Sequence, residues 1–349
     1  MAPLFSRWAF KASVADMIRK GARNLITDVQ GLLVGQAEDQ AARTGVTVLL
    51  AQAPFMAVVD LRGGAPGTFD VAGDAPLVTE VDAIVLAGGS AFGLEASIGV
   101  QAWLKDHGRG FEIAPGAPRV PIVRGAILFD LTNGGNKTWR EPPYRELGKA
   151  AAEKASADFK LGNAGAGFGA MAGRYKGGIG SASSMSDDGL TVGALAAVNA
   201  VGSPVISGSD VFWAFPLEQD GEFGGRKPQG SLAAGLDLPP DMKGATRLHA
   251  NTTIAAVATD AILSRDELER VAIMAADGFA RALRPAHTPF DGDLLFALST
   301  AKRALKEPRP VETMRLGHMA SDCLARTIAR GVYEAESLGG AKSYRDTFA

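Results

Sequence analysis

Cysteine and histidine are scarce in this chain of 349 residues, which contains one cysteine, Cys323, and four histidines. A lone cysteine cannot form an internal disulfide, and the scattered histidines have no metal-ligand spacing, so we expect neither a metal nor a cofactor. No Ser-His-Asp arrangement follows from their spacing, and each histidine is expected to be structural or at the surface. Cys323 lies on an apolar stripe of helical spacing and is expected in the core.

A surplus of charge of one sign and long apolar runs are also missing. The 36 Lys and Arg residues are balanced by 38 Asp and Glu residues, whereas a nucleic-acid-binding face needs a basic surplus. No stretch reaches about eighteen uninterrupted apolar residues, so no transmembrane helix is expected. The basic first 23 residues hold no continuous apolar segment. We therefore expect no signal peptide, no membrane or nucleic-acid partner, and a cytoplasmic protein.

Glycine is abundant, with 43 residues that cluster between short aliphatic segments. Such clusters mark turns and close backbone approaches. The mixture of strands and helices predicts an α/β or α+β class with layered sheets and no linker between domains. The predicted strands are 45–50, 56–61, 81–87, 122–131, 175–184, 190–201, 253–259 and 294–300. The predicted helices are 91–104, 144–157, one that begins after Ser264, and 311–338, and residues 216–250 are expected to form a long loop.

Three glycine-rich places raise the possibility of ligand binding. Gly88-Gly89-Ser90 follows a buried strand but fits neither G-x-G-x-x-G nor G-x-S-x-G, so a strand-to-helix turn is expected. Segment 163–169 could hold an anion with its backbone N–H groups, although no P-loop Lys-Ser/Thr pair follows it. Lys176 precedes a glycine pair. It is either a solvated turn residue or a cation placed close to a reacting centre.

Thr252 follows Asn251 where the long loop gives way to a strand. Taken alone, the pair could simply be the polar beginning of that strand. A threonine hydroxyl can, however, attack the carbonyl of its own preceding peptide bond, and hydrolysis of the ester makes threonine an N-terminus. Its α-amine, with an ordinary pKa of about 7.7–8.0, can then act as the base for its own hydroxyl. One residue would thus supply both nucleophile and base, and no histidine would be needed.

Asp291 and Asp293 flank a glycine about forty residues later, ahead of another predicted strand. A plain turn is one interpretation. A calcium loop is a second, but the remaining ligands of an EF-hand are missing. The third is a carboxylate pair that orients the amine and hydroxyl of the threonine.

Six blocks of the sequence occur in an order that is typical of one family. These blocks are 62–68, 81–95, 121–130, 176–183, 192–199 and 251–260. On these blocks the chain resembles the L-aminopeptidase/D-Ala-esterase and β-aminopeptidase family, which includes the nylon-oligomer hydrolases. The resemblance extends over about residues 28–338.

The resemblance implies a four-layer αββα sandwich of the α/β class, made as one chain that cuts itself before Thr252. The expected products are a large subunit, residues 1–251, and a small subunit, residues 252–349, which stay together as one structural domain. Homo-oligomers of these processed heterodimers are implied as well. The expected activity is that of an aminopeptidase or amidase that hydrolyses small L-, D- or β-aminoacyl amides or peptides through an acyl-enzyme on Thr252.

The resemblance also implies roles for residues around the threonine. Asn199 would donate a hydrogen bond to the oxyanion, and Lys176 would lie near the nucleophile. Asp291 and Asp293 would tune the nucleophile, and Tyr144 would line the substrate site.

Some features leave alternatives open. The threonine with two aspartates is more similar to the nylon-oligomer hydrolases, whereas blocks 62–68 and 176–183 are more similar to the peptidases. Arg174 could take the position of Lys176. A 6-aminohexanoate-oligomer hydrolase, an acetyltransferase of the ornithine-acetyltransferase type and an unprocessed small-molecule-binding protein are the alternative functions.

Overall fold

The structure is a computed structural model that describes residues 17–69, 79–230, 237–244 and 251–349. The first sixteen residues and six residues just before Asn251 therefore lie outside the described part, as do segments of the predicted long loop. The described portions of that loop are irregular except for one short 3-10 helix. Within the described residues, no helix combines the length and apolarity needed to cross a membrane.

Strands and helices are mixed along the chain, as the sequence predicts. The strands are β1 (Ile18–Arg19), β2 (Leu32–Asp39), β3 (Thr44–Leu61), β4 (Thr68–Phe69), β5 (Glu80–Ala87), β6 (Val123–Ile127), β7 (Met171–Ala172), β8 (Tyr175–Lys176), β9 (Ile179–Ser186), β10 (Thr191–Asn199), β11 (Thr252–Ile262) and β12 (Leu294–Ala304). The α-helices are α1 (Glu95–Asp106), α2 (Tyr144–Glu153), α3 (Arg265–Ala282), α4 (Arg309–Tyr333) and α5 (Tyr344–Thr347). The 3-10 helices are η1 (Ile26–Asp28), η2 (Ser90–Leu94), η3 (Gly165–Gly167) and η4 (Phe215–Leu217).

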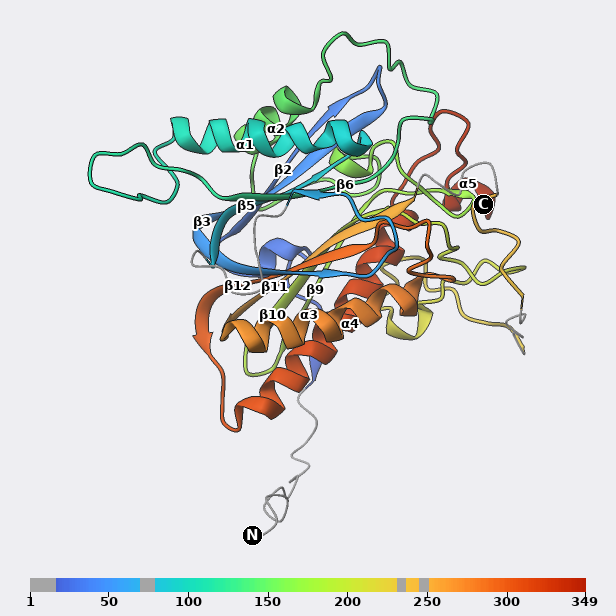
Figure 1. Cartoon of the computed structure of the whole chain (residues 1–349). Coiled ribbons are helices and arrows are strands. Elements are labelled where there is room, and N and C mark those ends of the chain that lie inside the picture. Colours follow the sequence, from blue (N-terminus) through green and yellow to red (C-terminus); the bar gives the residue numbers. More distant parts are fainter. Residues whose placement is uncertain (1–16, 70–78, 231–236, 245–250) are drawn as a thin grey trace.

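Two layers of sheet lie between two layers of helices (Figure 1). One sheet layer contains β1, β9, β10, β11 and β12, and the other contains β2, β5, β6 and β4. The long strand β3 belongs to both, because its first half pairs with β2 and β5 and its second half pairs with β12. A register shift between Leu50 and Phe55 marks the irregularity where the strand passes from one layer to the other. The predicted αββα sandwich is confirmed.

Each interface between layers has its own apolar core. Residues such as Ile84, Leu195 and Phe296 fill the space between the two sheet layers. A second core lies between the β9–β12 layer and helices α3 and α4, and it includes Cys323, which is completely buried as expected. A third core lies under α1 and α2 and includes Tyr144. Burial on this scale is the main source of stability in a chain of this size.

Local sequence signals explain several element boundaries. Ser264 accepts a hydrogen bond from the backbone N–H of Glu267, and the Glu267 side chain accepts one from the Ser264 N–H. This capping box fixes the beginning of α3 and is worth about 1 kcal/mol. Gly89 adopts a φ of 85° in the strand-to-helix turn after β5, as expected of a structural glycine.

Other boundaries differ from the sequence-based prediction. Segments 45–50 and 56–61 are the two halves of one bent strand, and β2 was not predicted at all. The predicted strand 122–131 shrinks to Val123–Ile127, and helix 144–157 ends at Glu153. The final long helix ends at Tyr333 rather than at residue 338. Element ends depend on tertiary hydrogen bonds, which a periodic pattern does not contain.

Candidate active site

Thr252 and Asn199 face each other at one end of two neighbouring strands. Asn199 ends β10 and Thr252 begins β11, and the antiparallel register pairs these two residues directly. Directly opposed residues place their side chains on the same face of a sheet. Leu195 and Ile254, which alternate in phase with them, belong to the core between the sheets. Both polar side chains therefore point inward, and Asn199 is 2% exposed and Thr252 5% exposed.

The carbonyl oxygen of Asn251 accepts two hydrogen bonds. One comes from the Thr252 hydroxyl, and the other comes from the backbone N–H of Gly292 at 3.0 Å. A parallel bridge between Asn251 and Asp291 holds the two segments together. The hydroxyl of Thr252 thus lies against the carbonyl of its own preceding peptide bond, and an N–H donor already polarises that carbonyl.

Gly292 leaves room for the threonine side chain. A β-carbon at position 292 would lie 2.6 Å from Thr252 Oγ1 and 2.7 Å from the backbone oxygen of Ala65. Real β-carbons do not approach other atoms this closely, so a larger residue would displace either the hydroxyl or the neighbouring loop. The glycine between the two aspartates is therefore required by close packing against Thr252.

Asp291 and Asp293 are both 1% exposed. Asp291 accepts hydrogen bonds from the backbone N–H of Val201 and from the N–H and hydroxyl of Thr288. Asp293 accepts one from the Thr253 N–H at 2.7 Å, and its other oxygen lies 3.0 Å from Nδ1 of His287. Burial, and then the neighbouring charge of Asp293, raise the pKa of Asp291 above its usual range. The calcium-loop interpretation finds no further support, because no group of three or more His, Cys, Asp or Glu residues in the described part could hold a metal ion.

The side-chain amide of Asn199 is oriented by hydrogen bonds with three residues. Its Oδ1 accepts hydrogen bonds from the backbone N–H of Met171 and from Nζ of Lys243, each at 3.0 Å. Lys243 also donates to the backbone oxygen of Asn199 at 3.0 Å. The amide nitrogen Nδ2 donates to the carbonyl of Phe129 at 3.1 Å. Two donors on one end identify that end as the oxygen, so the N–H groups point the other way.

Lys176 lies inside the molecule, whereas Arg174 is exposed. The Lys176 ammonium donates to the backbone carbonyls of Gly167 and Gly177 at 3.1 and 2.6 Å. Burial lowers the pKa of Lys176 to about 7, although the charge of Asp130 acts in the opposite direction. The solvated-turn interpretation of Lys176 is wrong, because the hairpin of β7 and β8 turns this side chain into the protein.

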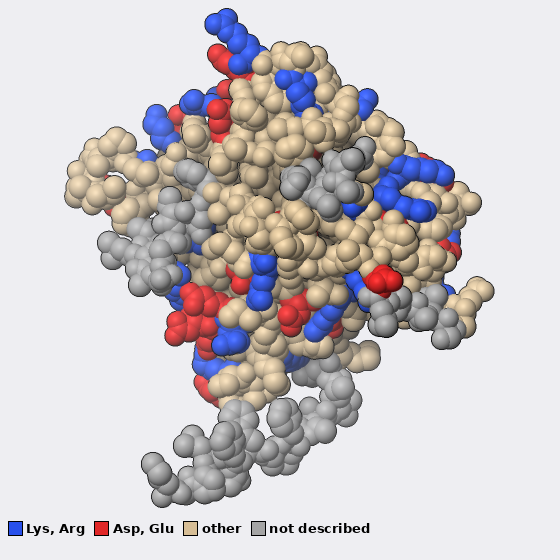
Figure 2. All heavy atoms as spheres, turned by 45° about the vertical axis from the view of Figure 1, so that its right-hand side comes forward, with Lys and Arg blue, Asp and Glu red and all other residues tan. Residues whose placement is uncertain are grey.

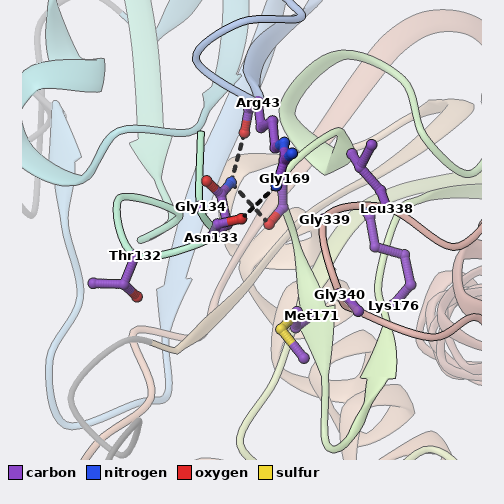
Figure 3. A pocket seen from close by; sticks show the side chains of 11 residues that line it. Arg43, Thr132, Asn133, Gly134, Gly169, Met171, Lys176, Leu338, Gly339 and Gly340 are labelled. Atoms are coloured by element: carbon purple, nitrogen blue, oxygen red, sulfur yellow. Dashed lines mark hydrogen bonds between the residues drawn. The ribbon is translucent and has the colours of Figure 1, made fainter. Parts of the chain in front are cut away.

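Two adjoining cavities lie beside these residues. The larger, of about 270 Å³, is lined by Lys176, Arg43 and a loop around Gly339 (Figure 3). Asn133 anchors its wall by donating to the backbone oxygen of Arg43 at 2.6 Å (Figure 3). The smaller, of about 30 Å³, is lined by Asn199 among others. The cavities share Thr132, Asn133, Gly169 and Met171 in their walls.

Tyr144 is completely buried and stands behind the smaller cavity. Its hydroxyl donates to Thr44 at 3.2 Å, and the Thr44 hydroxyl donates to Asp130 at 2.6 Å. Burial raises the pKa of Tyr144 above its ordinary value, so the phenol remains protonated. The structure thus connects Tyr144 to the cavity wall through Thr44 and Asp130, and a direct contact with substrate stays a prediction.

Three residues of this site have no signal in the sequence. Lys243 lies in the irregular segment before Asn251 and reaches Asn199 only through the fold. His287 was expected to be structural or at the surface, and its ring contacts Asp293. Asp130 lines the smaller cavity, and burial raises its pKa to about 6. None of them has a spacing relative to Thr252 that a local motif could reveal.

The face that carries α5 is turned forward in Figure 2. Uncharged residues cover much of this face, and Lys, Arg, Asp and Glu side chains are scattered over it (Figure 2). This face therefore shows no surface patch of one sign.

Comparison with solved structures places this fold in a known class. A β-aminopeptidase from a Burkholderia species has a TM-score of 0.68 at 20% identity, covering 95% of this chain and 94% of its own. The L-aminopeptidase D-Ala-esterase/amidase of Ochrobactrum anthropi, described as a variant of the Ntn-hydrolase fold, has a TM-score of 0.66 at 19% identity and covers 94% of this chain and 93% of its own. The layered fold is thus similar to this variant of the Ntn-hydrolase fold.

Sequence comparison then identifies the family. The profile of Peptidase family S58 matches residues 24–345. An uncharacterised aminopeptidase of Mycobacterium tuberculosis is 43% identical over 344 residues, with 93% of this chain and 98% of the relative covered. A 6-aminohexanoate-oligomer endohydrolase of a Kocuria species is 31% identical over 293 residues, with 80% and 76% covered. The chain belongs to peptidase family S58, and these relatives support a hydrolase of peptide or amide bonds.

Proposed function

We propose that the chain is a self-cleaving aminopeptidase or amidase of small amides, with Thr252 as its nucleophile. It would cut itself into residues 1–251 and residues 252–349. The observation that carries the proposal is the Thr252 hydroxyl, which lies against the carbonyl of its own preceding bond and opposite Asn199.

Self-cleavage needs the atoms that this arrangement brings together. The Thr252 oxygen attacks the Asn251 carbonyl carbon, and the negative charge that develops on the carbonyl oxygen is stabilised by the Gly292 N–H. The C–N bond then breaks, its nitrogen takes up the proton that the Thr252 hydroxyl gives up, and an ester joins Asn251 to the threonine side chain. Water hydrolyses the ester, which releases a carboxylate on Asn251 and an α-amine on Thr252.

Turnover uses the same hydroxyl with the new amine as its base. The amine of Thr252 accepts the hydroxyl proton while the oxygen attacks the substrate carbonyl, and the amine then passes the proton to the leaving group. Asn199 Nδ2 donates to the oxyanion, a contact worth a few kcal/mol of barrier. Water hydrolyses the acyl-enzyme in a second, similar step.

The buried charges fit the new amine. Asp293 accepts from the backbone N–H of Thr253, one residue beyond the proposed N-terminus. Two buried carboxylates at this point favour a cationic neighbour, and the α-ammonium formed by cleavage would supply one. Lys176, with a pKa of about 7, can change protonation near neutral pH beside the same cavities.

The charge of Asp130 favours acyl groups that carry a free amine. Asp130 lines the smaller cavity together with Asn199. With a pKa of about 6, Asp130 is largely ionised at neutral pH. A buried carboxylate beside the oxyanion donor favours an aminoacyl group, whose ammonium it attracts, over an acetyl group, which carries no charge.

Hydrolysis of 6-aminohexanoate oligomers is the second candidate, favoured by the Kocuria relative and by the paired aspartates beside a threonine. Such an oligomer also presents a free amine, but six atoms from the carbonyl. An acetyltransferase and an unprocessed binding protein have no comparable support.

A panel of p-nitroanilides of L-, D- and β-amino acids, 6-aminohexanoate dimer and oligomers, and N-acetylornithine with glutamate tests this function. We expect release of p-nitroaniline or of a free aminoacyl product, with loss of activity in Thr252→Ala. Acetyl transfer without hydrolysis, or binding without turnover across the panel, would overturn the proposal.

A further inference from the structure

Lys243 is the buried cation that directly contacts the proposed oxyanion donor. Its side chain is 5% exposed, and Nζ lies 3.0 Å from both Oδ1 and the backbone oxygen of Asn199. The backbone N–H of Lys243 donates to the Val201 carbonyl at 2.9 Å, just beyond the end of β10. Both ends of the lysine are therefore fixed. Its backbone is held by Val201, and its ammonium is held by Asn199.

The ammonium affects Asn199 in two ways. An asparagine amide can be turned end for end with little change in shape, and only its hydrogen-bond partners decide which end is the nitrogen. Lys243 can only donate, so it forces Oδ1 to face it and turns Nδ2 the other way, toward the Phe129 carbonyl. The positive charge of the ammonium that is hydrogen-bonded to Oδ1 also draws electron density from the amide, which makes Nδ2 a stronger donor.

The two buried lysines of the site therefore differ in what they touch. Lys176 donates to the backbone carbonyls of Gly167 and Gly177, and burial lowers its pKa to about 7. Lys243 donates to the side chain that is proposed to stabilise the oxyanion. Only Lys243 is placed to influence transition-state charge through Asn199.

We propose that Lys243 is a positioning residue that orients and polarises the Asn199 amide as an oxyanion donor. The proposal rests on the proposed function, since it gives Asn199 a partner for that reaction. An interaction that strengthens only as the oxyanion forms changes kcat and leaves KM largely unaltered.

The test compares Lys243→Met and Lys243→Arg with the wild-type full chain on the best amide of the panel. Lys149→Met is the matched control, because Lys149 is exposed on α2, in the helical layer that α1 and α2 form. We expect Lys243→Met to lower kcat by about 10- to 100-fold, less than the loss expected when a donor itself is removed, with KM within about threefold. Lys243→Arg keeps charge and donors and should retain more kcat, and Lys149→Met should behave as wild type.

Each outcome separates this inference from the function on which it rests. A wild-type chain that neither cuts itself nor hydrolyses any amide contradicts the proposed function. If wild type is active, an unchanged kcat in Lys243→Met, a loss confined to KM, or equal losses in the Met and Arg variants overturns the role of Lys243. Should Lys243→Met fail to fold, Lys243→Gln, which keeps a donor without the charge, is judged by the same division between kcat and KM.

Discussion

The two ends of strands β10 and β11 both bury polar side chains, but with different partners. At the end away from Asn199, Asp260 accepts from the backbone N–H of Thr191 and pairs with Arg303 at 3.4 Å. Thr259 donates to the Thr191 carbonyl at 3.0 Å. Burial raises the pKa of Asp260, although the Thr191 N–H and the Arg303 guanidinium both stabilise its negative charge.

At the other end, two carboxylates lie side by side instead of meeting an arginine. Asp291 and Asp293 are held by backbone N–H groups, the Thr288 hydroxyl and the His287 ring. The hydroxyl of Thr252 is turned onto a backbone carbonyl, as that of Thr259 is, but onto the carbonyl of its own preceding residue. The same residue types therefore serve stability at one end of a sheet and, on our account, chemistry at the other.

Replacement of the two threonines gives the largest contrast. Thr252→Ala should abolish self-cleavage and all amide hydrolysis, because it removes the nucleophile of both reactions. Thr259→Ala, the matched control, should cut and turn over normally while losing about 1–3 kcal/mol of stability through an unpaired buried carbonyl. Denaturing electrophoresis and an amide assay measure the first pair of effects, and urea unfolding measures the second. Loss of cleavage in both variants would contradict the different roles that we assign to the two ends of β10 and β11.

Asn199→Ala should have the next largest effect on catalysis. Removal of one oxyanion donor lowers kcat by about 10²–10³. Steady-state kinetics on the cut protein, scored per mole of small fragment, measures this loss separately from incomplete processing. A change in KM alone would argue that Asn199 binds substrate without stabilising the oxyanion.

Gly292→Ala should slow self-cleavage, since the added β-carbon would lie 2.6 Å from Thr252 Oγ1. Gly189→Ala, in a turn at the opposite end with a φ of 84°, is the control. Alanine is strained there, so a loss of about 1 kcal/mol in stability is expected without slower cleavage. The fraction cut, followed over time by electrophoresis from the moment of synthesis, distinguishes the two. Equal rates in Gly292→Ala and wild type would contradict the close fit around the nucleophile.

The smallest expected effect concerns stability and pH. The pKa of Asp291 in the folded state is raised above 3.8. Ionisation of this carboxyl therefore lowers the free energy of unfolding. The loss is complete above the folded pKa and disappears as pH falls through the unfolded pKa. Asp291→Asn, made in the uncut Thr252→Ala chain, should therefore raise the urea midpoint at pH 7 relative to its parent, and this gain should shrink toward pH 4.

Asp260→Asn supplies the comparison for Asp291→Asn. It should give a similar sign but a smaller gain, since it also loses the exposed Arg303 pair, worth at most about 1 kcal/mol. In the wild-type background Asp260→Asn should leave activity intact, whereas Asp291→Asn should reduce it. Equal activity in both would mean that Asp291 serves structure only.

Much of the fold could be predicted from the sequence. Alternating and continuous apolar runs located most strands, and Ser264 with Glu267 located the beginning of α3. The bend in β3 could not be predicted, because the register shift after Leu50 depends on pairing with β12 in the other layer. Helix ends such as Tyr333 were misplaced for the same reason.

The candidate site was likewise only partly predictable from the sequence. Thr252 was suggested by local chemistry, and Asn199, Lys176 and the two aspartates by family resemblance. Their packing at one end of β10, β11 and β12 depends on strand register, and so does the contact of Lys243 with Asn199. A side chain that acts through another leaves no spacing pattern, and only three-dimensional neighbours identify it.

N-terminal sequencing of the purified full chain, with intact mass under denaturing conditions, tests the central claim most directly. Our account predicts two fragments, one of them residues 252–349 beginning Thr-Thr-Ile-Ala. Thr252→Ala should remain one chain of full length. A single uncut species in wild type after long incubation, indistinguishable from Thr252→Ala, would contradict the account, as would a small fragment that begins at any other residue.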